Sequence, residues 1–226
     1  MAARIIQPEI KEIDDLGRED HYRKWLVKTP RGAVPMRLYD AAHPTAGVVL
    51  VGGVGGDFDT PARGLYPRLG EALIKEKVST LRVAFRYPTE LEESVHDLLA
   101  GIRLLAQQGL SRIGLVGHSF GGAVVLTAGA VAPEVATVIA LSTQSDGTDR
   151  VGDLAPRPIL FIHGSDDEVL PPFCSIDTCR RAGETKALQI IKGARHGLDE
   201  AADRVYLLVV DWLRRHLPLG PSQGLP

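Results

Sequence analysis

The chain is poor in cysteine. Its 226 residues include two, Cys174 and Cys179, which lie five positions apart on a segment predicted to be helical. Two thiols cannot form the dense disulfide framework of a small secreted domain, and we expect both to be reduced because cytosolic disulfides are rare. No cluster of cysteine and histidine completes a metal site around them, so no metal ion is expected.

The chain also lacks an excess of charge of either sign and lacks long apolar runs. Its formal net charge is −2, which excludes a basic field for nucleic acid and a basic amphipathic segment for anionic membranes. No uninterrupted apolar stretch approaches the roughly 18 residues of a membrane span. The beginning, MAARIIQPEIKEIDD, lacks the apolar core of a signal peptide and soon becomes acidic. We therefore expect a cytoplasmic protein that binds neither nucleic acid nor membrane.

What the sequence does contain is a regular alternation of strand and helix patterns, which is typical of an α/β protein with a mostly parallel sheet. Residues 1–20 are polar and predict an irregular N-terminal arm. An antiparallel hairpin is predicted next, with strands at 22–29 and 34–40 around Pro30-Arg31-Gly32. Further strands are predicted near 47–52, 79–85, 112–116, 136–142, 158–163 and 187–192.

Helices are expected between these strands, on both faces of the sheet. Apolar residues at helical spacing mark the buried faces of two of them. We expect one domain over residues 21–217, large enough for a full core, and a flexible tail over 218–226. The two apolar faces comprise Leu91, Val95, Leu98, Leu99, Ile102 and Leu105 on one helix, and Val205, Leu208, Val209, Trp212 and Leu213 on the other.

The most informative motif is Gly117-His118-Ser119-Phe120-Gly121, which follows the apolar run 113–116. The pattern G-x-S-x-G between a strand and a helix is typical of a nucleophile elbow. So tight a turn requires small residues at Gly117 and Gly121. It would expose the Ser119 hydroxyl above the sheet and aim the N–H of Phe120 at a developing oxyanion. A serine hydroxyl needs a base and a group that orients the base.

Candidates for both roles follow at the ends of later strands. Ser165-Asp166-Asp167-Glu168 comes directly after the predicted strand at 158–163, and Gly193-Ala194-Arg195-His196-Gly197 follows the strand at 187–192. The order is therefore serine, aspartate, histidine, each just past the carboxyl end of a strand. In open α/β sheets, sites form at those ends.

With these motifs the chain resembles an α/β-hydrolase, from about residue 22 to residue 216. The resemblance rests on GHSFGG (117–122), HGSDDEVLPP (163–172) and GARHG (193–197). It implies that Ser119 is the nucleophile, His196 the base and Asp167 the acid. Asp166 is a neighbouring alternative, and Asp146 another, because some family members place the acid after the preceding strand.

A glycine-rich loop, Gly52-Gly53-Val54-Gly55-Gly56, follows the apolar strand 48–51. It lacks the Gly-Lys-Ser/Thr ending of a phosphate-binding loop and has Phe58 where a dinucleotide fingerprint requires its third glycine. The family usually has His-Gly-x-Gly here, and this chain has Gly52 instead of the histidine. The resemblance implies that the backbone N–H of Val54, or of a residue next to it, joins Phe120 in an oxyanion hole.

The segment between the strands ending near Ser142 and starting near Pro158 is about fifteen residues of polar, turn-rich sequence. Many relatives insert a helical cap there, and this segment is too short for one. The resemblance thus implies a fold without a cap domain and an open, shallow site, which argues against a lipase with an interfacial lid.

The implied function is hydrolysis of a carboxylic ester or related small acyl substrate through an acyl-enzyme, with no metal or organic cofactor. Some relatives of the dienelactone-hydrolase type use cysteine as nucleophile, and Ser119 departs from that pattern. A haloalkane dehalogenase would have aspartate at position 119, so that class is disfavoured. A thioesterase or small peptidase would use the same triad, so both stay open. A non-catalytic binding module of the same fold is a further alternative. The sequence leaves the natural substrate and the oligomeric state open.

Overall fold

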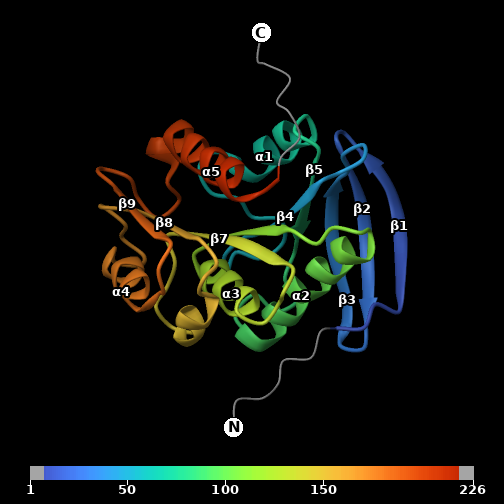
Figure 1. Cartoon of the computed structure of the whole chain (residues 1–226), viewed down its shortest axis with the longest axis horizontal. Coiled ribbons are helices and arrows are strands. Elements are labelled where there is room, and N and C mark those ends of the chain that lie inside the picture. The colour runs from blue at the N-terminus through green and yellow to red at the C-terminus, as the bar shows by residue number, and fades with distance from the viewer. Residues whose placement is uncertain (1–7, 219–226) are drawn as a thin grey trace.

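The computed structural model describes residues 8–218, which form one nine-stranded sheet covered by helices on both faces (Figure 1). The strand order is β1-β2-β3-β5-β4-β6-β7-β8-β9. Strands β4 to β9 are parallel to one another, whereas β1, β2 and β3 are antiparallel. The strands are β1 (Glu12–Glu19), β2 (Tyr22–Thr29), β3 (Gly32–Tyr39), β4 (Ala46–Val51), β5 (Val78–Val83), β6 (Ile113–His118), β7 (Val135–Leu141), β8 (Ile159–Gly164) and β9 (Lys186–Ile191).

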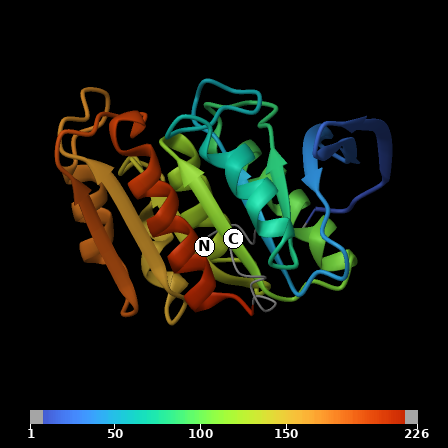
Figure 2. The same cartoon turned by 90° about the horizontal axis from the view of Figure 1, so that it is seen from above.

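The helices divide into two layers. Figure 1 shows α1 and α5 above the sheet and α2, α3 and α4 below it, and Figure 2 shows the antiparallel strands set apart at one end. The helices are α1 (Leu65–Ile74), α2 (Leu91–Gln107), α3 (Phe120–Gly129), α4 (Phe173–Arg181) and α5 (Ala202–His216), with short 3₁₀ helices η1 (Asp149–Leu154) and η2 (Asp199–Ala201).

The central strands are apolar because both of their faces are covered. Every residue of β4, β6 and β8 is buried, which is typical of parallel strands between two helix layers. One core cluster packs α2 and α3 against the sheet, and a second packs α1 and α5 against the other face. The expected helix faces are confirmed, since Leu98 and Leu105 of α2 and Val205, Val209 and Leu213 of α5 are fully buried.

The N-terminal region differs from the expectation. The polar pattern of residues 1–20 predicts an irregular arm, but Glu12–Glu19 forms β1, an edge strand paired with β2. The strand is polar because it is exposed along most of its length. Cross-strand ion pairs join it to β2, including those of Lys28 with Glu12 and Asp14. Residues 1–7, and the predicted tail beyond Pro218, lie outside the described residues.

The segment between β7 and β8, residues 142–158, contains the short helix η1 and no other helix or strand. This segment therefore forms no cap domain. The predicted architecture is confirmed in this respect: a mostly parallel sheet with helices on both faces, antiparallel strands at the N-terminal end and no cap. Among residues 8–218, none of the helices combines the length and apolar character that crossing a lipid bilayer requires.

Candidate active site

Ser119 lies in a strained turn between β6 and α3. Its backbone has φ 57° and ψ −120°, a combination that residues other than glycine rarely adopt. Two backbone hydrogen bonds hold the turn: Ser119 N–H donates to the carbonyl of Leu141 at 2.8 Å, and Gly122 N–H donates to the carbonyl of Ser119 at 2.9 Å. The turn places Ser119 at the carboxyl edge of the sheet, as the elbow motif predicts.

The glycines of the motif are required by close backbone approach. A Cβ on Gly117 would overlap the carbonyl of Gly121, and a Cβ on Gly121 would overlap the carbonyl oxygen of Gly52 in the glycine-rich loop. The elbow and the glycine loop after β4 are therefore in direct backbone contact. This contact sets how near the loop can come to Ser119: a Cβ on Gly53 would lie 3.2 Å from that of Ser119.

Replacing Gly121 with alanine should destabilise the fold by about 3 kcal/mol or more, at or above the upper range for overpacking, because a backbone carbonyl cannot move aside as a side chain can. Gly152→Ala is the matched control, since the nearest atom to its added Cβ is 3.7 Å away, and it should change stability by about 0.5 kcal/mol or less. Urea denaturation of both variants measures this. Equal stability of the two would contradict the close approach.

Three side chains from different strand ends meet at this edge. His196, which follows β9, has Nε2 3.0 Å from Ser119 Oγ. Its Nδ1 is 2.8 Å from Asp167 Oδ2, on the turn after β8. The two later turns are joined by backbone hydrogen bonds, because Asp166 N–H donates to the carbonyl of Ala194 at 3.0 Å. Ser119, His196 and Asp167 therefore form a continuous hydrogen-bonded chain.

Asp167 is held as an oriented carboxylate. Its side chain is fully buried, yet Oδ1 accepts the N–H groups of Val169 at 2.9 Å and Leu170 at 2.8 Å. Burial by itself raises the pKa of Asp167, but these N–H groups and His196 outweigh it and hold the pKa below its ordinary value. The group is thus ionised at neutral pH and accepts hydrogen bonds on both oxygens.

The alternative acids lie elsewhere. Asp166 is exposed and accepts a hydrogen bond from the Ser165 hydroxyl at 2.6 Å. Asp146 is exposed on the loop after β7. Within residues 8–218, neither is hydrogen-bonded to His196, whereas Asp167 is. The structure therefore brings Asp167, not its neighbours, to the histidine.

His163 makes a contact that the sequence did not reveal. Its Nε2 is 3.0 Å from Asp167 Oδ2 and 3.1 Å from the carbonyl of Leu170. Because both are acceptors, Nε2 carries the proton, and Nδ1 accepts from the Ser175 hydroxyl at 2.6 Å. His163 thus contacts Oδ2 of the carboxylate, whereas Val169 donates to Oδ1. Its place at the end of β8, four residues before Asp167, was the available signal.

His118 lies against His196. It is buried, its Nε2 is 2.9 Å from the backbone carbonyl of His196, and the two imidazole rings are 4.9 Å apart. Burial lowers the pKa of His118 to about 4 and also lowers that of His163. Both rings are therefore neutral at neutral pH, and His118 donates its Nε2–H to the main chain that carries His196.

These two neutral histidines predict a loss of stability in acid. Below the ordinary pKa of 6.5 the unfolded chain binds protons that the folded chain does not, so stability falls as pH drops from about 6.5 towards the folded values. Each histidine contributes a slope of up to about 1.4 kcal/mol per pH unit. Urea denaturation at several pH values should show a shallower slope for His118→Gln than for the wild type, with His43→Gln, an exposed control, unchanged. Identical slopes would refute the neutral, buried state of His118.

The predicted oxyanion donors are one residue after Ser119 and in the glycine loop. Phe120 follows Ser119 directly, and its ring packs edge-on against Phe85 at 5.9 Å. Val54 is exposed in the glycine loop. Within residues 8–218 neither N–H makes a backbone hydrogen bond outside regular helices and strands. Their role as a pair remains a prediction.

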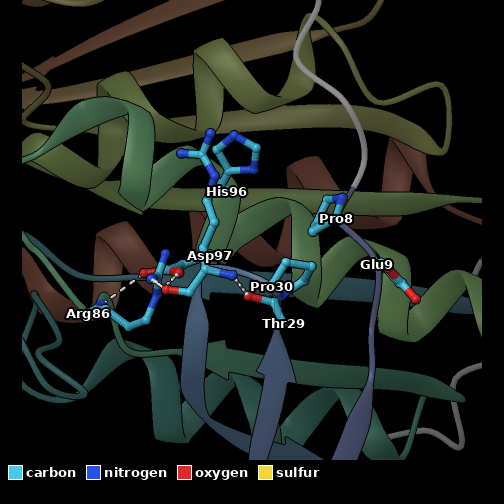
Figure 3. A pocket seen from close by; sticks show the side chains of 8 residues that line it. Pro8, Glu9, Thr29, Pro30, Arg86, His96 and Asp97 are labelled. Atoms are coloured by element: carbon cyan, nitrogen blue, oxygen red, sulfur yellow. Dashed lines mark hydrogen bonds and ion pairs between the residues drawn. The ribbon is translucent and has the colours of Figure 1, made fainter.

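A separate cavity of about 320 Å³ lies near the N-terminal strands (Figure 3). Arg86 lines it, but its guanidinium is engaged by Asp97 at 2.6 Å and Glu93 at 2.7 Å. Figure 3 shows the Arg86–Asp97 pair below His96. None of Ser119, Asp167 and His196 lines this cavity. The paired charges fix the loop that follows β5. Arg31, the other arginine that lines the cavity, is also paired, with Glu92 and Glu93.

Comparison with known proteins identifies the fold. No family model matches the chain, and no curated protein matches it in sequence. Solved structures do. A dienelactone hydrolase from Anabaena variabilis has a TM-score of 0.74 at 21% identity, covering 87% of this chain and 99% of that one. An esterase domain from Rhodothermus marinus has a TM-score of 0.69 at 21% identity, covering 91% and 99%.

A serine hydrolase without a lid from Xanthomonas campestris is also similar, with a TM-score of 0.69 at 20% identity, covering 90% of this chain and 99% of that one. The coverage shows that the similarity extends over nearly the whole of each relative. The chain therefore has the fold of the small α/β-hydrolases without a cap.

Proposed function

We propose that this protein is a serine hydrolase that cleaves a carboxylic ester or a closely related acyl bond. The observation that carries the proposal is the continuous hydrogen-bonded chain from Asp167 through His196 to Ser119. The similarity in fold to a dienelactone hydrolase and to an esterase domain supports an ester as the first substrate class to test.

In the proposed reaction, Ser119 Oγ attacks the carbonyl carbon of the substrate while His196 Nε2 takes the hydroxyl proton. Asp167 accepts the Nδ1–H of His196, which keeps the other ring nitrogen free to act as a base and stabilises the imidazolium. When the tetrahedral intermediate collapses, His196 gives the proton to the leaving oxygen and an acyl-serine remains. Water then attacks the acyl-serine, with His196 removing its proton and returning it to Ser119.

The N–H groups of Phe120 and Val54 are proposed to stabilise the negative charge on the tetrahedral intermediate. Such a donor contributes about 3 kcal/mol to the transition state. The lack of a cap leaves the acyl group open to solvent on one side, so we propose a small substrate rather than a long-chain lipid. Thioesters would react by the same steps.

The test is covalent labelling with a fluorophosphonate, which reacts with activated serines. The wild type should be labelled and should hydrolyse p-nitrophenyl acetate, propionate and butyrate, and Ser119→Ala should not be labelled. A folded wild type that takes no label and hydrolyses none of these esters would overturn the proposal and favour a binding module of this fold.

A further inference from the structure

Two arginines lie side by side on adjacent strands, on the face of the sheet that α1 covers. Arg37 of β3 and Arg82 of β5 are direct partners in the antiparallel pairing, and Lys24 of β2 is the next partner of Arg37. Three cations thus stand in one row across three strands. Like charges directly opposite each other are destabilising, so this row requires negative charge nearby.

Of these three cations, Lys24 forms an ion pair with a carboxylate. Its hydrogen bond to Glu19, with a smaller contribution from the charge of Arg37, holds the pKa of Glu19 below its ordinary value. Lys24 pairs with Glu19 at 2.8 Å, and Glu19 also accepts the Tyr22 hydroxyl at 2.9 Å. Within residues 8–218, neither Arg37 nor Arg82 forms an ion pair with a carboxylate. The sequence outside that range contains no aspartate or glutamate.

Arg82 is the more unusual of the pair. It is 4% exposed, and its guanidinium donates one hydrogen bond to the backbone carbonyl of Phe58. Its Nε is buried without a hydrogen-bond partner, as is Thr80 Oγ1 two residues earlier on the same strand face. A buried charge that forms no ion pair is costly, and an unpaired buried donor adds to that cost.

Arg37 is positioned by stacking rather than by an acid. Its guanidinium lies 4.0 Å from the centre of the Phe58 ring and 5.0 Å from that of Tyr22. Stacking leaves the edge of the guanidinium, with its N–H donors, free. Both arginines therefore retain donors that the described protein does not use.

A cavity of about 330 Å³ opens onto this pair. Its two carboxylates, Asp20 and Glu71, are exposed, whereas Arg82 is buried. A second cavity of about 700 Å³ shares His21 and Glu71 with the first. The second cavity adds the cations Arg18, Arg68 and Lys75.

We propose that the Arg37–Arg82 cavity binds the oxyanion group of a small molecule, a phosphate or a carboxylate. The N–H donors of two guanidinium groups match the oxygens of such a group, and a bound anion would neutralise the neighbouring charges. The excess of cations in the adjoining cavity extends the positive field along which the rest of an anionic ligand would lie. Ser119, Asp167 and His196 line neither cavity, so this site is separate from the proposed reaction.

Isothermal titration calorimetry of the full chain with inorganic phosphate and, separately, with acetate tests the proposal. The matched variants are Arg37→Gln and Arg103→Gln, the latter an exposed arginine on α2. Wild type and Arg103→Gln should bind at least one of the two anions at a single saturable site, and Arg37→Gln should bind it at least 10-fold more weakly. Tighter binding of phosphate assigns a phosphate group as the ligand, and tighter binding of acetate assigns a carboxylate.

Absence of saturable binding of both anions by the folded wild type would overturn the proposal. So would equal weakening in Arg37→Gln and Arg103→Gln, because that would indicate only a general response to charge. Arg82→Met provides a second test through thermal unfolding: phosphate or acetate should raise the midpoint of the wild type and not of this variant. If both midpoints rise equally, the buried arginine does not hold the anion.

Discussion

Replacing Ser119 with alanine is expected to lower kcat for ester hydrolysis by about 10⁶-fold, and replacing His196 with alanine by a similar factor, because the two side chains act as a unit. Ser119 Oγ and His196 Nε2 are 3.0 Å apart, so loss of either removes the same proton transfer. The double variant should therefore be no slower than either single variant. Release of p-nitrophenol from p-nitrophenyl acetate measures kcat for the two single variants and the double variant.

Ser111→Ala is the matched control, an exposed serine at the opposite end of β6. It should keep wild-type turnover. Thermal unfolding must accompany the kinetics, because Ser119 occupies a strained backbone conformation and its replacement could change stability as well. A folded Ser119→Ala protein with near-wild-type turnover would contradict the assignment of the nucleophile. Multiplicative effects in the double variant would contradict a shared proton transfer.

Much of this site could be predicted because its parts are local in sequence. The elbow is specified by five consecutive residues, and the tight turn requires the small residues at Gly117 and Gly121 that close backbone contacts demand. The strand positions follow from apolar runs that are buried on both sides. Ser119, Asp167 and His196 follow the carboxyl ends of β6, β8 and β9, which brings them to one edge of a parallel sheet.

Other features depend on pairings that no local pattern encodes. Residues 12–19 are polar on most positions, so their periodicity does not predict a strand, and pairing with β2 decides their conformation. The facing of Arg37 and Arg82 depends on the register between β3 and β5, strands separated by β4 and α1 in the sequence. The contact of His163 with Asp167 depends on the path of one turn. Each becomes visible only when the register is known.

Asp167→Asn is expected to lower kcat by about 10⁴-fold, the effect of reversing the tautomer of the base in a serine triad. The carboxylate accepts two backbone N–H groups on Oδ1 and two ring N–H groups on Oδ2. An asparagine has one oxygen for these four donors. Since the backbone donors of Val169 and Leu170 cannot change, the amide oxygen should face them and the NH₂ should face His196.

His196 would then accept on Nδ1 and carry its proton on Nε2, where it cannot receive the proton of Ser119. His163 faces the same reversal, which would turn its Nε2 lone pair towards the carbonyl of Leu170, so Asp167→Asn should also lower the free energy of unfolding. Asp166→Asn is the control, because that exposed carboxylate contacts the Ser165 hydroxyl and not His196, and it should leave kcat within a few-fold of wild type. A large loss in Asp166→Asn beside an active Asp167→Asn would move the acid to the neighbouring residue. Equal, small losses in both variants would remove Asp167 from the mechanism. They would show that His196 takes the proton of Ser119 without a carboxylate to orient its ring.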